Sequence, residues 1–100
     1  MEFEKPSKTG FTIYGKSGCT NCLKTKVFLK EKNLIFNVID CDEYIIEDKP
    51  AFLSFIKEIS GKDVKMFPIV FYEGQFIGGF NETVDYVCKL LLSFEDNFSF

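Results

Sequence analysis

Two cysteines three residues apart are the groups in this sequence best suited to chemistry. Cys19 and Cys22 belong to a 100-residue chain that holds four cysteines. A pair with this spacing can form and break a disulfide, because a thiolate is the nucleophile in thiol–disulfide exchange. A structural disulfide is disfavoured because nothing marks the chain as secreted. A zinc site is disfavoured because the remaining cysteines, Cys41 and Cys88, are isolated in the sequence.

The cysteine pair lies where a strand is predicted to pass into a helix. Residues 11–14 alternate in polarity and are rich in aromatic and β-branched types, which predicts a strand. Residues 20–32 have apolar residues at the helical period, which predicts a helix. A thiol at a helix N-terminus faces unpaired backbone N–H groups and the positive end of the helix dipole, which stabilise its thiolate. Lys16 adds a positive charge. We therefore expect Cys19 to attack, and Cys22, on the stripe facing the sheet, to be more buried and to resolve.

The other elements follow from hydrophobic period and turn residues. A largely buried strand is predicted over residues 34–41, followed by a helix with Pro50 in its first turn and Gly61 at its end. Two strands follow over residues 67–72 and 75–77, joined by the turn Glu73-Gly74. A last helix is predicted to be capped by Asn81. The last helix has an inward face made of Val84, Val87, Cys88 and Leu91. Cys41 and Cys88 are therefore expected to be buried and inert.

Composition and charge narrow the classes of protein to which the chain could belong. The chain has 46% hydrophobic and 17% aromatic residues, enough to fill a core. It has no histidine, so every catalytic or metal site that requires an imidazole is excluded. The net charge of −3 disfavours nucleic acid as a ligand. The apolar runs are too short to cross a bilayer. The amino-terminal segment has no apolar stretch, so we expect no secretory signal and a cytoplasmic location.

One domain is expected between two irregular ends. Residues 1–10 are polar and predict a flexible lead-in, residues 11–92 hold the predicted elements, and residues 93–100 show no period and are expected to be frayed. Charge is unevenly divided along the chain. Residues 1–32 contain seven lysines and three acidic residues, whereas residues 33–100 contain five lysines and twelve acidic residues. The redox pair therefore lies in the basic part of the sequence.

These motifs resemble those of the glutaredoxin family, in the family's order. A Cys-x-x-Cys pair follows the first strand, Phe67-Pro68 opens a later strand, and a hairpin ends in Gly78-Gly79. Residues 16–19 resemble the family's Lys-x-x-Cys, and residues 77–82 resemble its Gly-Gly-aromatic-Asp-Asp motif. The resemblance spans roughly residues 11–92 and favours glutaredoxin over thioredoxin, since no Trp precedes the first cysteine. It implies an α/β, thioredoxin-like fold, βαβ-α-ββα, with a four-stranded mixed sheet flanked by three helices.

The resemblance also implies which residues bind glutathione. Lys16 is expected near the glycine carboxylate, and Phe67, before a cis Pro68, is expected to pair its backbone with the cysteinyl part as an added strand. The γ-glutamyl end is expected at the N-terminus of the last helix, where backbone N–H groups can receive a carboxylate. The residues implied there are Gly79, Phe80, Asn81 and Glu82. Asn81-Glu82 departs from the family's Asp-Asp pair.

The function implied is thiol–disulfide exchange with glutathione as co-substrate. Clients are protein disulfides or glutathione mixed disulfides, with ribonucleotide reductase among the candidates. The resemblance implies a monomer without a metal, nucleic-acid or membrane partner. Three alternatives stay open: a dithiol electron donor reduced by thioredoxin reductase, a carrier in which Cys19 and glutathione hold a 2Fe-2S cluster between two subunits, and an interaction module with incidental redox chemistry.

Overall fold

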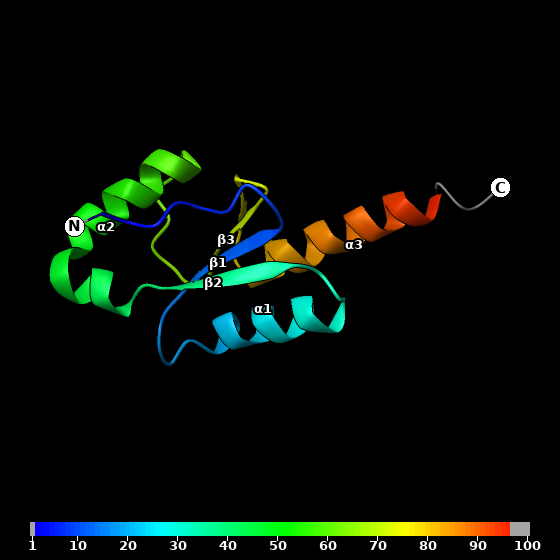
Figure 1. Cartoon of the computed structure of the whole chain (residues 1–100), viewed down its shortest axis with the longest axis horizontal. Helices are drawn as coiled ribbons and strands as arrows, with labels where there is room; N and C mark the ends of the chain where they lie inside the picture. The colour runs from blue at the N-terminus through cyan, green and yellow to red at the C-terminus, as the bar shows by residue number, and fades with distance from the viewer. Residues whose placement is uncertain (1, 97–100) are drawn as a thin grey trace.

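The computed structural model describes residues 2–96, with side chains to residue 92. Its elements are β1 (Phe11–Gly15), α1 (Thr20–Glu31), β2 (Phe36–Asp40), α2 (Asp42–Ser60), β3 (Ile69–Tyr72), β4 (Gln75–Gly78) and α3 (Phe80–Asp96) (Figure 1). This order confirms the predicted βαβ-α-ββα arrangement of a thioredoxin-like fold, with a four-stranded sheet and three helices. Over the described part of the chain, none of the helices combines the length and apolarity that a membrane crossing requires.

The sheet is mixed, with strand order β2-β1-β3-β4. β1 pairs in parallel with β2 through the α1 crossover, and antiparallel with β3. All five residues of β1 are buried because the strand has a neighbour on each side and helices over both faces. The register joins Tyr14 to Ile69 and Val70 to Gly78, so the end of β1, the start of β3 and the end of β4 lie at one edge of the sheet.

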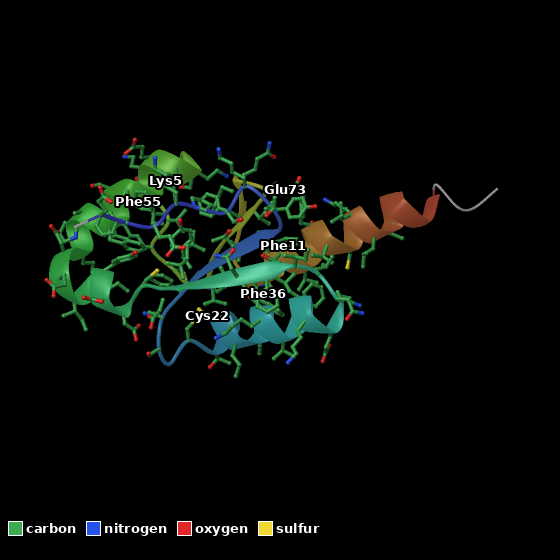
Figure 2. The ribbon with its side chains drawn as sticks, in the orientation of Figure 1. Lys5, Phe11, Cys22, Phe36, Phe55 and Glu73 are labelled. Atoms are coloured by element: carbon green, nitrogen blue, oxygen red, sulfur yellow. A yellow bond between two sulfur atoms is a disulfide. The ribbon has the colours of Figure 1, made fainter. Side chains whose placement is uncertain are left out.

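Helices cover both faces of the sheet. α1 and α3 share one face, where the buried cluster is Phe11, Ile13, Leu29, Val70 and Val87. α2 covers the other face, where the buried cluster is Tyr14, Ile39, Cys41, Phe52, Ile56, Ile69 and Phe71. Figure 2 shows Phe36 on the side of β2 that faces α1, and Phe55 on α2. Each large apolar side chain that is fully buried contributes roughly 1.5–3 kcal/mol, so the two clusters hold the helices on the sheet.

α2 consists of two helical segments that meet at a kink. Asp48, at φ −159° and ψ 78°, interrupts the helix, and its carboxylate accepts a hydrogen bond from the Ala51 N–H at 3.1 Å. Asp48 therefore caps the second segment, and Pro50 lies in its first turn as predicted. Gly61 ends the helix in the left-handed conformation at φ 76°, also as predicted. The first segment, which begins at Asp42, was not predicted.

Two predictions about burial are wrong. β2 is an edge strand, so of its five residues only Ile39 is buried and Val38 is 42% exposed, in contrast to the predicted buried strand over 34–41. Cys88 is exposed, because Val87 takes the position of α3 that faces the sheet and turns the Cys88 side chain outward. The prediction for Cys41 is confirmed, since its side chain is fully buried.

The amino-terminal segment has no helix or strand, yet it is fastened to the domain. The Tyr14 hydroxyl donates to the Glu4 carbonyl at 2.6 Å, and the Glu4 N–H donates to the Tyr44 hydroxyl at 3.1 Å. Phe3 packs against the α2 cluster. We call residues 2–6 the amino-terminal strap. Aromatic packing and hydrogen bonds thus hold the strap against the domain, and the flexibility predicted for residues 1–10 stays a prediction.

At the carboxyl end α3 extends to Asp96, beyond the domain end predicted at residue 92. The helix thus includes the first part of the segment 93–100 that was expected to be frayed. The rest of that prediction falls on residues 97–100, which lie outside the described residues. In Figure 1 the carboxyl half of α3 extends away from the sheet.

The hydrogen bond from Tyr14 to Glu4 should contribute measurably to stability. We expect Tyr14→Phe to lower the free energy of unfolding by about 1 kcal/mol in urea titrations, the typical net value of one intramolecular hydrogen bond. Tyr72→Phe is the matched control, because among the described residues the half-buried Tyr72 side chain has no hydrogen-bond partner. An equal loss in both variants would contradict the role of the Glu4 contact.

The burial of Cys41 should make stability depend on pH in the alkaline range. Burial, aided by the charges of Asp40 and Asp42, raises the pKa of Cys41 to about 12. The folded protein therefore keeps this proton at a pH where the unfolded chain loses it, so stability is full below pH 9 and falls as the pH rises toward 12. Between pH 8 and 10 we expect the unfolding free energy of wild type to fall about 1 kcal/mol more than that of Cys41→Ala. Cys88→Ala removes an exposed thiol, so its unfolding free energy should fall by the same amount as that of wild type over this pH range.

Candidate active site

The redox pair lies at the junction of β1 and α1, as predicted. Cys19 and Cys22 form a disulfide with their Cα atoms 5.2 Å apart. Cys19 is the N-cap of α1, and its Sγ accepts a hydrogen bond from the Cys22 N–H at 3.1 Å. Cys22 is 4% exposed on the face of α1 that packs on the sheet, whereas Cys19 is half-buried. The predicted difference in burial between the two cysteines is confirmed.

The loop before Cys19 is held by an acid that sequence analysis missed. The Ser17 N–H donates to Asp42 Oδ1 at 2.8 Å, and the Ser17 hydroxyl donates to the other oxygen of the same carboxylate. These hydrogen bonds, together with the charge of Lys16, lower the pKa of Asp42. Asp42 begins α2, so the first turn of that helix fixes the loop that carries Cys19. No local sequence pattern predicts this contact, because it joins residues 25 positions apart.

Lys16 links the same loop to Phe67. Its ammonium lies 5.5 Å from the centroid of the Phe67 ring, a distance suited to a cation–π interaction. The Phe67 ring also stacks on the Phe52 ring, with centroids 6.2 Å apart and planes 3° apart. The Phe67-Pro68 bond is cis, as the resemblance implied. Lys16, Cys19 and Cys22 line a shallow hollow on the loop, beside the groove described next.

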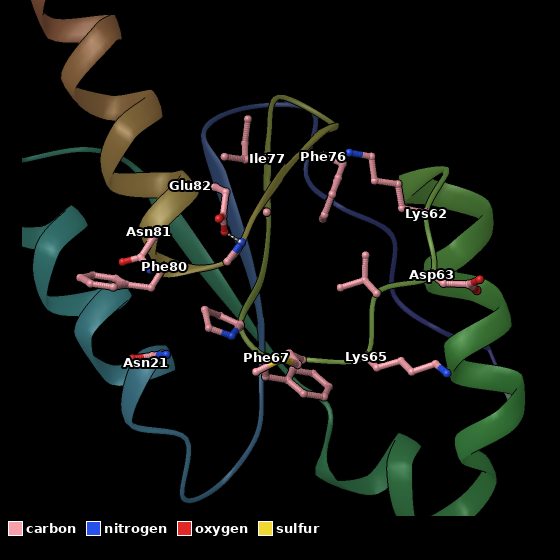
Figure 3. Close-up of a pocket in the computed structure, with 15 residues that line it drawn as sticks. Asn21, Lys62, Asp63, Lys65, Phe67, Phe76, Ile77, Phe80, Asn81 and Glu82 are labelled. Atoms are coloured by element: carbon pink, nitrogen blue, oxygen red, sulfur yellow. Dashed lines mark hydrogen bonds between the residues drawn. The ribbon is translucent and has the colours of Figure 1, made fainter.

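A groove of about 560 Å³ lies at the end of the sheet where β3 begins and β4 finishes (Figure 3). It brings together six of the predicted glutathione-binding residues, which are Phe67, Pro68, Gly79, Phe80, Asn81 and Glu82. Asn21, from within the Cys-x-x-Cys motif, lines the same groove and places it next to the redox pair. The opposite wall comes from the loop between α2 and β3 and includes Lys62 and Lys65. Asn21 and these lysines were not predicted as site residues.

The N-terminus of α3 forms one end of the groove, and its cap differs from the prediction. Phe80 is the first helical residue, and Glu82 Oε1 accepts a hydrogen bond from the Gly79 N–H at 2.8 Å (Figure 3). Asn81 is exposed inside the first turn, so its predicted capping role is wrong. A glutamate two residues after the first helical position is a known capping pattern, and it could have been recognised in the sequence.

Gly78 is required by this arrangement. It adopts φ 139°, and a Cβ atom built on it would lie 2.7 Å from the Cβ of Glu82. Both the backbone conformation and the space thus restrict the position to glycine. The close approach lets the Glu82 side chain fold back over the end of β4, where it reaches the Gly79 N–H.

No metal centre is formed by the described side chains. Across residues 2–92, no three His, Cys, Asp or Glu residues gather in a way that could hold a metal ion.

Comparison with known proteins points to one family. The family model for glutaredoxin matches residues 11–77, which is more than half of the chain. Glutaredoxin 1 of Rickettsia typhi is 34% identical over 67 residues, which make up 67% of this chain and 60% of that protein. The match thus spans less than two thirds of the length of this relative.

Solved structures agree with this match. Glutaredoxin 1 of Francisella tularensis, in complex with cacodylate, has a TM-score of 0.70 and 25% identity, covering 81% of this chain and 94% of its own. The buckwheat glutaredoxin–glutathione complex has the same fold, with a TM-score of 0.64 and 20% identity over 79% of this chain and 68% of its own. With the redox pair at the start of α1 and the groove beside it, the matched sequence and fold establish that the chain belongs to the glutaredoxin family.

Proposed function

We propose that the chain is a glutathione-dependent thiol–disulfide oxidoreductase with Cys19 as its nucleophile. The observation that carries this proposal is the hydrogen bond from the Cys22 N–H to Cys19 Sγ at the N-terminus of α1. In the reduced protein the same N–H group and the helix dipole favour the thiolate of Cys19. Cys19 is also the more exposed of the two cysteines, so it is the one that a disulfide substrate can reach.

The reaction has two routes after a common first step. The Cys19 thiolate attacks the glutathione sulfur of a mixed disulfide, a new disulfide forms between Cys19 and glutathione, and the client leaves as a thiolate that takes up a proton. In the first route the thiolate of a second glutathione attacks the bound glutathione sulfur, which releases glutathione disulfide and regenerates the Cys19 thiolate. In the second route Cys22 attacks Cys19, glutathione leaves, and two further glutathiones reduce the resulting Cys19–Cys22 disulfide.

The groove supports glutathione as the co-substrate. Among the described residues no hydrogen bond uses the backbone N–H or C=O of Phe67, so both groups are available to a tripeptide laid beside it as a short strand. The N-terminus of α3 offers backbone N–H groups to the γ-glutamyl carboxylate. Lys16 is available for the glycine carboxylate, since its ammonium already lies over the Phe67 ring. The buckwheat glutaredoxin, which shares the fold, was solved with glutathione.

The charge of the groove supports the same assignment. Lys62 and Lys65 lie on the wall opposite α3, and Lys16 lies beside the redox pair. Asp63 and Glu82 line the same groove, so its lining carries charges of both signs, as glutathione does with its two carboxylates and one ammonium. Clients such as ribonucleotide reductase, a monomeric state and a cytoplasmic location stay predictions that this proposal includes.

The assignment of the thiols can be tested in a coupled assay. NADPH oxidation is followed with glutathione, glutathione reductase and a glutathionylated small disulfide. We expect turnover by wild type, loss of turnover to background in Cys19→Ser because the nucleophile is gone, and retained turnover in Cys22→Ser because the one-cysteine route needs no resolving thiol. Cys88→Ser, which removes an exposed thiol outside the groove, is the control and should match wild type.

The alternatives give different results in the same experiment. Turnover that appears only when thioredoxin reductase replaces glutathione and glutathione reductase would make the protein a dithiol donor. Activity retained in Cys19→Ser would contradict the assignment of the nucleophile. Iron and visible absorbance in protein purified without oxygen, lost together in Cys19→Ser, would support the cluster carrier instead.

Glu82 provides a test of the γ-glutamyl end of the groove. Glu82→Gln keeps an oxygen for the Gly79 N–H but removes the negative charge that this proposal assigns to the γ-glutamyl ammonium. We expect kcat/KM for the glutathionylated substrate to fall about fivefold, because a charge-assisted hydrogen bond is stronger than a neutral one. Asp85→Asn is the matched control, since Asp85 lies on the same helix outside the groove and pairs with Lys89. An equal fall in both variants would indicate a general effect of charge on the substrate.

A further inference from the structure

A row of aromatic rings connects the amino-terminal strap to the groove. The Phe3 ring packs edge-on against the Phe52 ring, with centroids 5.5 Å apart. The Phe52 ring is fully buried and stacks on the Phe67 ring, with centroids 6.2 Å apart. Three residues far apart in sequence thus form one continuous contact, which begins in a segment without secondary structure and ends at the groove.

The strap end of this row is well fixed. Besides the Phe52 ring, the Phe3 ring packs on the rings of Tyr44 and Phe55, both on α2, with centroid distances of 5.0 Å and 5.3 Å. The two hydrogen bonds of Glu4 hold the next residue to Tyr14 and Tyr44. In Figure 2 the strap crosses α2 where Phe55 is labelled. Phe3 is therefore one of the rings that pack around Phe52, and the one that the strap supplies.

The groove end of the row lies in a loop. Phe67 lies between α2 and β3, outside both elements, and none of the hydrogen bonds between described residues uses its backbone. Its half-buried side chain packs against the α2-side cluster, where its ring stacks on the Phe52 ring and lies under the Lys16 ammonium. Lys16 is exposed whereas Phe52 is fully buried, so the contact with Phe52 is the one that belongs to the core.

We propose that Phe3 is a positioning residue for the disulfide substrate, acting through Phe52 on the backbone of Phe67. This inference rests on the proposed function, in which the Phe67 backbone pairs with glutathione. With Phe3 present, Phe52 cannot tilt toward the strap, and the Phe67 N–H and C=O stay aligned to receive a peptide. Without Phe3, the substrate must order Phe52 and Phe67 as it binds, which weakens its binding. The redox pair itself does not touch this row and keeps its own reactivity.

The experiment separates substrate positioning from thiol reactivity. In Phe3→Ala we expect kcat/KM for a glutathionylated peptide to fall about threefold to tenfold, the range that corresponds to the loss of one aromatic pair. In the Cys22→Ser background, the rate at which iodoacetamide alkylates Cys19 should stay within about twofold of its value with Phe3 intact, because this small reagent needs no groove. Phe3→Leu, which keeps an apolar side chain without the ring, should give an intermediate kcat/KM and serves if Phe3→Ala unfolds.

Tyr86→Ala is the matched control. Tyr86 is also a half-buried aromatic residue, but it packs on Phe11 and Tyr72 on the opposite face of the sheet. We expect it to lower the melting temperature while leaving kcat/KM near the wild-type value. An unchanged kcat/KM in folded Phe3→Ala, an equal fall in Tyr86→Ala, or a parallel fall in the alkylation rate would each overturn the inference. Absence of turnover in wild type would instead overturn the proposed function, and this inference with it.

Discussion

The antiparallel pairing of β1 with β3 is the constraint on which the site depends. Because the two strands run in opposite directions, the end of one and the start of the other meet at the same edge of the sheet. The redox pair follows β1 and Phe67-Pro68 precedes β3, so segments nearly fifty residues apart become neighbours. The hairpin from β3 to β4 brings the chain back to that edge, where α3 begins. Three motifs are thereby assembled by pairing alone.

The two faces of the sheet have different tasks in this arrangement. On one face, α1 supplies the N-terminus that stabilises a thiolate, and α3 supplies the N-terminus that can receive a carboxylate. On the other face, α2 supplies support: Asp42 fixes the loop before Cys19, and Phe52 fixes the ring of Phe67. Cys19 and Phe67 thus lie where loops meet regular elements, and the helices and the buried strand β1 hold these loops in place.

The order of the elements and the position of the redox pair could be predicted because they depend on local patterns, and the resemblance supplied six of the residues that line the groove. Pro50, Gly61 and Glu73-Gly74 mark turns and helix ends through their own backbone preferences. The errors concern features that depend on distant neighbours. The exposure of Cys88 follows from the rotation of α3 on the sheet, and the exposure of β2 follows from its place at the edge. The contact of Ser17 with Asp42 and the packing of Phe3 join distant segments, for which a single sequence offers no period.

The exposed thiol on α3 has a practical use. With Cys19 and Cys22 joined and Cys41 sealed in the core, Cys88 is the thiol that the oxidised protein offers to solvent. A maleimide dye added without reductant should therefore attach at one defined place, on the helix whose first turn borders the groove. Fluorescence from that place could follow the encounter of the protein with its clients while leaving both redox cysteines unmodified.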